Sequence, residues 1–239
     1  MKKILLVTLL SSTLAIGSCD SLKQIAGILV PSEFEMAAGL REALTQGMFR
    51  SFDAFANPEG NSAIRFAFPG DAAKIETTLR DLGMQKLVDQ VTSKFTRAAS
   101  SAVTAAKPIF LDAVRNMTIR DAVGILLTDN QRAATDYFKS NMSASLMTAF
   151  RPIVDSSINL TGANRDWSSI VNVYNKIPFI NQPLESSLTD FIAARAVDYM
   201  FSTIAKEEED IRTKLEFRKT DLMRKVFGYA EQELARRRN

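Results

Sequence analysis

The chain has 239 residues, 46% of them hydrophobic and 24% charged, and it contains one cysteine and no histidine. This composition is typical of a globular protein, whereas the lack of histidine excludes Ser-His-acid and Cys-His nucleophiles and the commonest transition-metal ligand. The formal charge of +3 includes a single basic run, Arg236-Arg237-Arg238, which is too terminal to form a nucleic-acid interface. We interpret that run as a solvated helix end, with contact to anionic lipid as the alternative.

The N-terminus has the organisation of a cleavable secretion signal. Lys2 and Lys3 precede an apolar stretch, residues 4–16, which is shorter than the roughly 20 apolar residues that span a bilayer. The sequence Ile16-Gly17-Ser18-Cys19 resembles the lipobox of bacterial lipoproteins, in which the cysteine is acylated and becomes the first mature residue. We therefore expect a signal peptide over residues 1–18 and lipid attachment at Cys19. An ordinary signal peptide with a chance cysteine is the alternative.

Acylation of Cys19 has consequences for location and stability. The protein would lie in the periplasm of a bacterial cell envelope, tethered to the inner or the outer membrane. A mature chain without a free thiol has neither disulfides nor thiolate chemistry, so an apolar core must stabilise it. Residues 19–31 are then the lipidated cysteine and a tether, and residues 32–239 form one helical domain.

The start of the domain has helical periodicity followed by one extended segment. Ser32-x-x-Glu35 is a capping box that opens a helix, and the Asn-Pro-Glu-Gly sequence at 57–60 ends it. Residues 63–68 place Ile and Phe at alternate positions, which predicts a short extended segment. The apolar residues of the helix recur at spacings of three or four and share one face: Ala37, Leu40, Leu44, Met48, Phe52 and Phe55.

The next helices are bounded by recognisable caps. Asp71 can cap a helix that closes near Gly83, and Pro108 is expected to bend or restart the helix after it. Thr118-x-x-Asp121 is a second capping box. The second of these helices has an apolar stripe that ends in small residues: Leu87, Val91, Phe95, Ala98, Ala102 and Ala105.

A long helix is expected after residues 128–130, whose Thr, Asp and Asn side chains can cap it, with a kink at Pro152. Residues 161–187 break the periodicity and leave one short helix around residues 167–174. Three aromatic residues of this region either line a pocket or, in the interpretation we favour, cover the end of the core: Trp167, Tyr174 and Phe179.

The last third predicts two helices, over residues 194–215 and 223–234, because apolar residues again recur at helical spacing. Residues 206–219 mix both charge signs, which predicts an exposed face with weak ion pairs. The sequence as a whole therefore predicts an all-α single domain of about seven to nine helices.

Carboxylates are the catalytic candidates that remain. Asp112, Asp121 and Asp136 are candidates for an acid and base pair, although their spacing alone does not bring them together. Residues 207–210, Glu-Glu-Glu-Asp, have the charge for a hard cation but lack the alternating ligands and turn glycine of a calcium loop. We interpret them as a hydrated helix face. With no Gly-rich phosphate loop and no Ser-x-x-Lys motif, no cofactor or metal site is expected.

Different short motifs are distributed along most of the mature chain: Gly39-Leu40-Arg41-Glu42-Ala43-Leu44, Phe66 to Pro69, Asn116-Met117-Thr118 with Asp121-Ala122 and Ile125-Leu126, Ala134-Thr135 with Tyr137-Phe138, Glu208-Glu209 with Ile211-Arg212, and Leu222 with Lys225-Val226-Phe227-Gly228. These motifs resemble the bacterial domain-of-unknown-function family 4197, whose members are secreted proteins or lipoproteins. The resemblance implies a mostly helical single domain. It implies no activity and no catalytic residues.

Two hypotheses follow about sites and function. Arg41 and Asp121 lie beside apolar stripes, which favours a partly buried ion pair between two helices. For function, the leading hypothesis is a non-enzymatic, membrane-tethered module that binds another envelope protein or an apolar ligand. The alternative is a carboxylate-dependent hydrolase acting on an envelope polymer, which requires two acidic side chains in one cleft.

Overall fold

The structure is a computed structural model that describes residues 30–56, 71–176 and 188–238. These residues form eight α-helices and one 3₁₀ turn and contain no strand, which confirms the predicted all-α fold. The helices are α2 (Glu33–Ala56), α3 (Asp71–Asp81), α4 (Gln85–Asn116), α5 (Ile119–Leu126), α6 (Ala133–Thr161), α7 (Ala163–Tyr174), α8 (Thr189–Thr213), the 3₁₀ turn η3 (Leu215–Phe217) and α9 (Asp221–Arg238).

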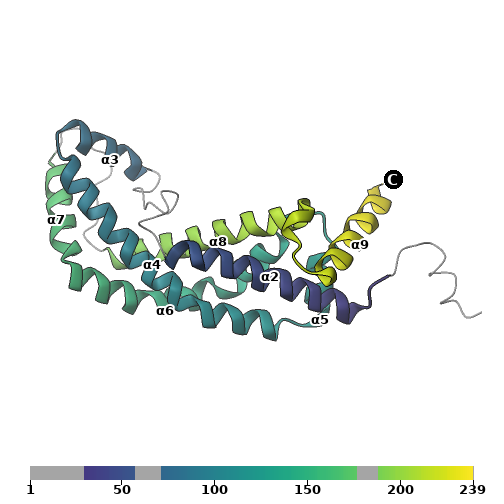
Figure 1. The fold of residues 1–239 in the computed structure, drawn as a ribbon. Coiled ribbons are helices and arrows are strands. Elements are labelled where there is room, and N and C mark those ends of the chain that lie inside the picture. Colours follow the sequence, from purple (N-terminus) through teal and green to yellow (C-terminus); the bar gives the residue numbers. More distant parts are fainter. Residues whose placement is uncertain (1–29, 57–70, 177–187, 239) are drawn as a thin grey trace, which may run out of the picture.

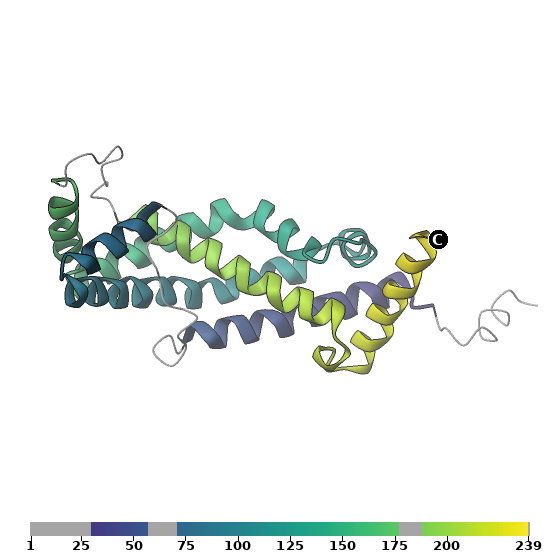
Figure 2. The same cartoon turned by 90° about the horizontal axis from the view of Figure 1, so that it is seen from above.

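The four long helices α2, α4, α6 and α8 pack side by side into an elongated bundle (Figure 1). Helix α4 contacts the other three, and α8 packs against both α2 and α6. The short helices lie at the two ends: α3 and α7 at one, α5 and α9 at the other, where the described chain also begins (Figures 1 and 2). The start of α2 and the end of α9 therefore share one end of the molecule.

The core runs the length of the bundle and is rich in aromatic side chains. Phe110 of α4 contacts Phe138 of α6 and Phe201 of α8, with ring centroids 5.0 and 6.2 Å apart. Further along, the rings of Phe55 and Tyr199 meet edge to face at 5.2 Å. Burial of each large apolar side chain contributes about 1.5–3 kcal/mol, so this continuous core joins the four long helices into one unit.

Both predicted capping boxes are confirmed. At the start of α2 the Ser32 hydroxyl accepts from the Glu35 amide at 3.2 Å, and the Glu35 carboxylate accepts from the Ser32 amide at 2.9 Å. At the start of α5 the Thr118 hydroxyl accepts from the Asp121 amide at 3.1 Å and donates to the Asp121 carboxylate at 2.7 Å. These bonds satisfy amides that have no partner within the helix.

Two prolines lie within continuous helices. Helix α4 runs through Pro108 and α6 runs through Pro152. Of the bend or restart predicted at Pro108, the restart is therefore wrong. Each proline removes a single backbone donor, and the packing of both helices against several neighbours keeps them helical on either side. Helix α6 continues past Pro152 to Thr161. It ends there because the next residue, Gly162, has a φ of +68°, a left-handed conformation that glycine adopts without steric cost.

Several predictions concern residues outside the described ranges: the signal peptide, Cys19, most of the tether, the extended segment at 63–68, and Phe179. In the part of the chain that is described, no helix has both the length and the apolar character needed to cross a bilayer.

Candidate functional site

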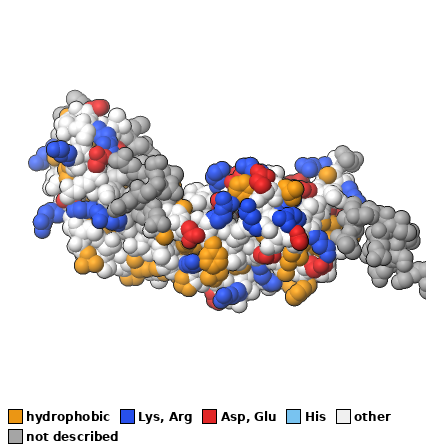
Figure 3. Space-filling view, viewed as in Figure 1, with side chains coloured by type: hydrophobic (Ala, Val, Ile, Leu, Met, Phe, Trp, Pro, Cys, Tyr) orange, Lys and Arg blue, Asp and Glu red, His pale blue; other side chains and the backbone are white. Residues whose placement is uncertain are grey.

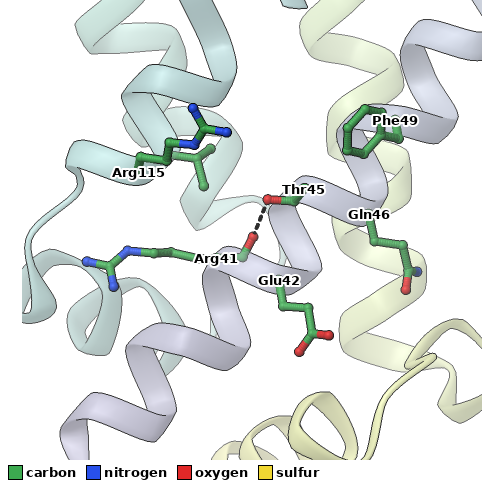
Figure 4. Close-up of a pocket in the computed structure, with 7 residues that line it drawn as sticks. Arg41, Glu42, Thr45, Gln46, Phe49 and Arg115 are labelled. Atoms are coloured by element: carbon green, nitrogen blue, oxygen red, sulfur yellow. Dashed lines mark hydrogen bonds between the residues drawn. The ribbon is translucent and has the colours of Figure 1, made fainter. Parts of the chain in front are cut away.

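An open cleft lies between α2 and the C-terminal end of α4, with a volume of about 460 Å³. Five residues of α2 line it together with two from the last turn of α4: Arg41, Glu42, Thr45, Gln46, Phe49, Val114 and Arg115. Figure 4 shows that the Arg41 and Arg115 side chains extend on one side of the cleft, whereas Glu42 and Gln46 point to the opposite side. The cleft thus has a basic wall and a polar wall.

Arg41 on the basic wall does not form the predicted ion pair with Asp121. Its guanidinium donates to the backbone carbonyl of Met117, just beyond the end of α4, where the helix dipole favours a cation. The Asp121 carboxylate is engaged by the Thr118 and Tyr137 hydroxyls, at 2.7 and 3.3 Å. The predicted pair is therefore wrong, because the Arg41 guanidinium donates to a backbone carbonyl and the Asp121 carboxylate accepts from two hydroxyls instead.

The basic wall carries more positive charge than its neighbours neutralise. Among the described residues, neither Arg41 nor Arg115 has a carboxylate within ion-pair distance, and the Arg41 Nε is buried without a hydrogen-bond partner. Lys107 lies over the ring of Phe49, 4.3 Å from its centroid. The cleft therefore combines unneutralised guanidinium groups with an aromatic surface.

The polar wall is held in place by the turn that joins α8 to α9. The Gln46 amide donates to the Phe217 carbonyl at 2.7 Å, and the Glu42 carboxylate accepts from the Thr220 hydroxyl at 3.0 Å. Among the described residues, Glu42 is the single carboxylate that lines this cleft. Because it is already hydrogen-bonded away from the basic wall, it does not neutralise Arg41 or Arg115.

A buried polar network lies behind the cleft, at the same end of the bundle. The Glu208 carboxylate on α8 accepts from the backbone amides of Ala134 and Thr135 at 2.9 and 2.8 Å, and from the Thr135 hydroxyl at 2.8 Å. It also accepts from the Arg212 Nε at 3.0 Å. Glu208 thereby caps the N-terminus of α6 from another helix, where a negative charge is favoured.

Arg212 caps the C-terminal end of α5. Its guanidinium donates to the Ile125 and Leu126 carbonyls, at 2.8 and 3.4 Å. Arg218 in turn donates to the Ile211 and Arg212 carbonyls at the end of α8, at 2.9 and 2.6 Å, and pairs with Glu231. These buried charges are partnered by helix ends and by each other, so the network holds three helix termini together and offers no open site.

This network corrects the prediction for residues 206–219. They were expected to form an exposed charged face, and residues 207–210 a hydrated one. Instead Glu208, Asp210, Arg212 and Arg218 are buried, whereas Glu209 is exposed as expected. The charges alternate sign at i, i+4 spacing, as on a solvated helix, and their burial depends on helix ends that are distant in the sequence.

Two carboxylates beside the network have shifted pKa values. Burial raises the pKa of Glu207, and the ion pair with Arg50 at 3.1 Å only partly opposes that effect. The hydrogen bond from Lys214, at 2.6 Å, lowers the pKa of Asp210 and raises that of Lys214. The pKa of Glu207 is therefore raised and that of Asp210 is lowered, although the two residues are only three positions apart on α8. Neither residue lines the cleft.

The acidic candidates from the sequence are not assembled around the cleft. Asp112 is exposed on α4, Asp121 belongs to the cap of α5, and Asp136 accepts from the Asn130 amide at 2.9 Å at the start of α6. None of the three lines the cleft. Within the described ranges no group of three potential ligand residues can hold a metal ion.

The aromatic candidates lie at the opposite end of the bundle. Trp167 is buried, with its ring centroid 5.7 Å from that of Phe95 and 6.4 Å from that of Phe191, and Tyr174 packs against the core. For these two residues the structure confirms the interpretation as a cover of the core end. The cleft was not predicted from the sequence. The sequence feature that could have indicated it is that neither Arg41 nor Arg115 has an acidic residue four positions away on its helix.

The described segments that carried the family resemblance converge on this end of the molecule, and residues 66–69 lie outside the described ranges. They supply the middle of α2, the α4–α5 junction, the start of α6, the end of α8 and the first part of α9. No curated protein and no solved structure is similar enough to match the chain. A family model described as "Protein of unknown function (DUF4197)" matches residues 30–228. The chain therefore belongs to the DUF4197 family of proteins of unknown function.

Proposed function

We propose that this chain is a non-enzymatic binding module of the bacterial cell envelope, tethered to a membrane through acylated Cys19. The α2–α4 cleft is its binding site, and the ligand carries a carboxylate or phosphate group next to an apolar part. The lipobox-like sequence before Cys19 supports the tether. The composition of the cleft supports the ligand class.

One observation carries this proposal: two guanidinium groups without a carboxylate partner, Arg41 and Arg115, line an open cleft beside the ring of Phe49. A guanidinium presents several donors in a planar fork that matches the oxygens of a carboxylate or phosphate. The aromatic ring offers apolar surface next to them. A ligand with both features satisfies both parts of the cleft.

The hydrolase alternative has less support. Glycoside hydrolysis by paired carboxylates requires two acidic groups about 5–10 Å apart across the scissile bond. Glu42 is the single carboxylate that lines the cleft, and the Thr220 hydroxyl already donates to it. We therefore favour binding over catalysis.

Isothermal titration calorimetry with octyl phosphate, octanoate and the uncharged probe octanol tests this proposal. We expect both anionic probes to bind and octanol to bind more weakly. Arg115→Ala should weaken binding of the anionic probes about tenfold or more, because a charge-assisted hydrogen bond contributes about 1.5–3 kcal/mol. Arg115 is the better choice because it is exposed, whereas Arg41 also supports the end of α4.

Arg97→Ala is the matched control. Arg97 is an exposed arginine on the same helix, 18 residues before Arg115 and therefore about 27 Å away along the axis. Its replacement should leave binding unchanged. Equal affinity for octanol and the anionic probes, or an equal effect of both arginine substitutions, contradicts the proposed site.

A further inference from the structure

We propose that the side of the bundle formed by α2 and the α4–α5 junction lies against the anionic headgroups of the membrane that holds the lipid anchor. We call this surface the α2 stripe and define it by six residues: Phe34, Arg41 and Phe49 of α2, Arg115 of α4, and Ile119 and Arg120 of α5. The proposal deepens the proposed function and rests on its lipid anchor.

The α2 stripe follows from helix geometry. Positions 34, 41, 45 and 49 are separated by seven, four and four residues, so they share one face of α2. Arg41 donates to the carbonyl of Met117, which places this face next to the α4–α5 junction. Ile119 and Arg120 follow Met117 by two and three residues. The residues of the α2 stripe, of which Arg41 is half-buried and the other five are exposed, are therefore neighbours.

Exposure and charge distinguish the α2 stripe from an ordinary helix surface. Phe34, Phe49 and Ile119 are 67%, 37% and 39% exposed. A single exposed apolar residue is normal, but here three of them accompany three arginines without carboxylate partners among the described residues. Figure 3 shows hydrophobic, basic and acidic side chains interspersed over this side of the bundle. Apolar side chains among basic ones are typical of surfaces that bind anionic bilayers.

Acidic side chains lie near these cations but do not pair with the arginines. Glu42 faces Thr220 on the other wall of the cleft, Asp53 is exposed four residues after Phe49, Asp112 is exposed three residues before Arg115, and Asp121 follows Arg120. Among the described residues, none of these carboxylates lies within ion-pair distance of an arginine of the α2 stripe. The exposed guanidinium groups of Arg115 and Arg120 can therefore bind the phosphates of anionic headgroups.

The position of the tether identifies the occupant. The described chain begins at Val30, which is 46% exposed and lies four residues before Phe34. The ten residues between Cys19 and Val30 span at most about 35 Å, so an acyl chain on Cys19 keeps this end of α2 near the bilayer. Val30, Phe34 and Ile119 are exposed at the end of the bundle nearest the anchor, which favours the bilayer over a protein partner.

Spin labels on the acylated full-length protein in vesicles test this proposal. Since acylation consumes Cys19, Phe34→Cys, Phe49→Cys and the control Leu160→Cys each introduce one labelling site; Leu160 is 86% exposed on α6. On vesicles of phosphatidylglycerol and phosphatidylethanolamine, the labels at positions 34 and 49 should show a several-fold higher ratio of oxygen to aqueous nickel-complex accessibility than the label at 160. On phosphatidylcholine vesicles that difference should shrink.

Charge reversal separates a lipid contact from nonspecific adsorption. The double substitution Arg115→Glu and Arg120→Glu should return the labels at positions 34 and 49 to an aqueous signal, whereas Arg97→Glu should not. If the protein floats with the vesicles but every label stays aqueous, the membrane contact is wrong and the anchor stands. If the protein does not float, the anchor fails and the contact fails with it. Octyl phosphate binding without lipid-exposed labels assigns the cleft to a soluble ligand and overturns the contact.

Discussion

At the scale of single residues, the chain uses buried charges to close helix ends. Glu208 neutralises the start of α6, Arg212 the end of α5 and Arg218 the end of α8. Burying a charge is costly unless hydrogen bonds and an opposite charge surround it, and here both are present. This arrangement explains why a domain without disulfides keeps several charged side chains in its interior.

Glu208→Gln should be strongly destabilising. The amide leaves Arg212 buried without its counter-charge and removes at least one bond to the start of α6, and breaking a buried pair on one side typically costs about 3–5 kcal/mol. Glu209→Gln, on the adjacent exposed residue, should change the free energy of unfolding by less than about 0.5 kcal/mol. Urea unfolding curves of both variants check this prediction, and similar midpoints for the two would refute the role of Glu208.

The two shifted carboxylates on α8 predict opposite pH effects. The lowered pKa of Asp210 means that its contribution to stability is complete above the ordinary value of 3.8 and is lost as pH falls through the lower native value. The raised pKa of Glu207 means that its contribution is present below 4.5 and is lost as pH rises through the native value. Asp210→Asn should therefore reduce the loss of stability between about pH 7 and pH 3, and Glu207→Gln should increase it. Unfolding free energies at the two pH values check both signs, and a shift of the same sign in both variants would be inconsistent with this interpretation.

At the scale of elements, sequence and structure agree wherever the determining contact is local. The Ser32–Glu35 and Thr118–Asp121 boxes join residues three apart, and both helix starts are predicted correctly. The cap of α6 by Glu208 joins Ala134 to a residue 74 positions away, and nothing in the local sequence indicates it. The cleft also depends on contacts between residues that are distant in the sequence, because its basic wall joins α2 to α4 and its polar wall joins α2 to the α8–α9 turn.

The contact between α2 and α9 depends on a glycine. A Cβ added at Gly39 would lie 2.5 Å from a methyl group of Val226, so the two helices approach too closely for any side chain at that position. By contrast, a Cβ added at Gly228, on α9, would have no atom within 4 Å apart from its own stretch of helix backbone. Gly39→Ala should therefore destabilise the protein, whereas Gly228→Ala should stabilise it by up to about 1 kcal/mol through helix propensity.

Thermal unfolding of the two glycine variants and of one double variant checks the helix contact. Adding Val226→Ala to Gly39→Ala should recover part of the lost stability, because it removes the methyl groups that meet the new Cβ. If the two substitutions are simply additive, the close approach of α2 and α9 is not what limits position 39.

At the scale of the whole molecule, the proposed binding site lies at one end of an elongated bundle. The start of α2, the cleft and the network of helix ends lie together, and the opposite end is closed by apolar packing around Trp167. The proposed acyl anchor at Cys19 precedes Val30, the first described residue, by eleven positions. We therefore predict that the bundle presents its cleft and the α2 stripe toward the membrane and extends its other end away from it.

Mass spectrometry of the protein purified from the membranes of the cells that make it decides whether the chain is a lipid-anchored module. We expect the mature chain to begin at Cys19, to lack residues 1–18 and to carry acyl groups on that residue, whereas Cys19→Ser should leave the protein unacylated and outside the membrane fraction. A native protein with an intact Met1, or with an unmodified Cys19, would show that the chain is not anchored in this way.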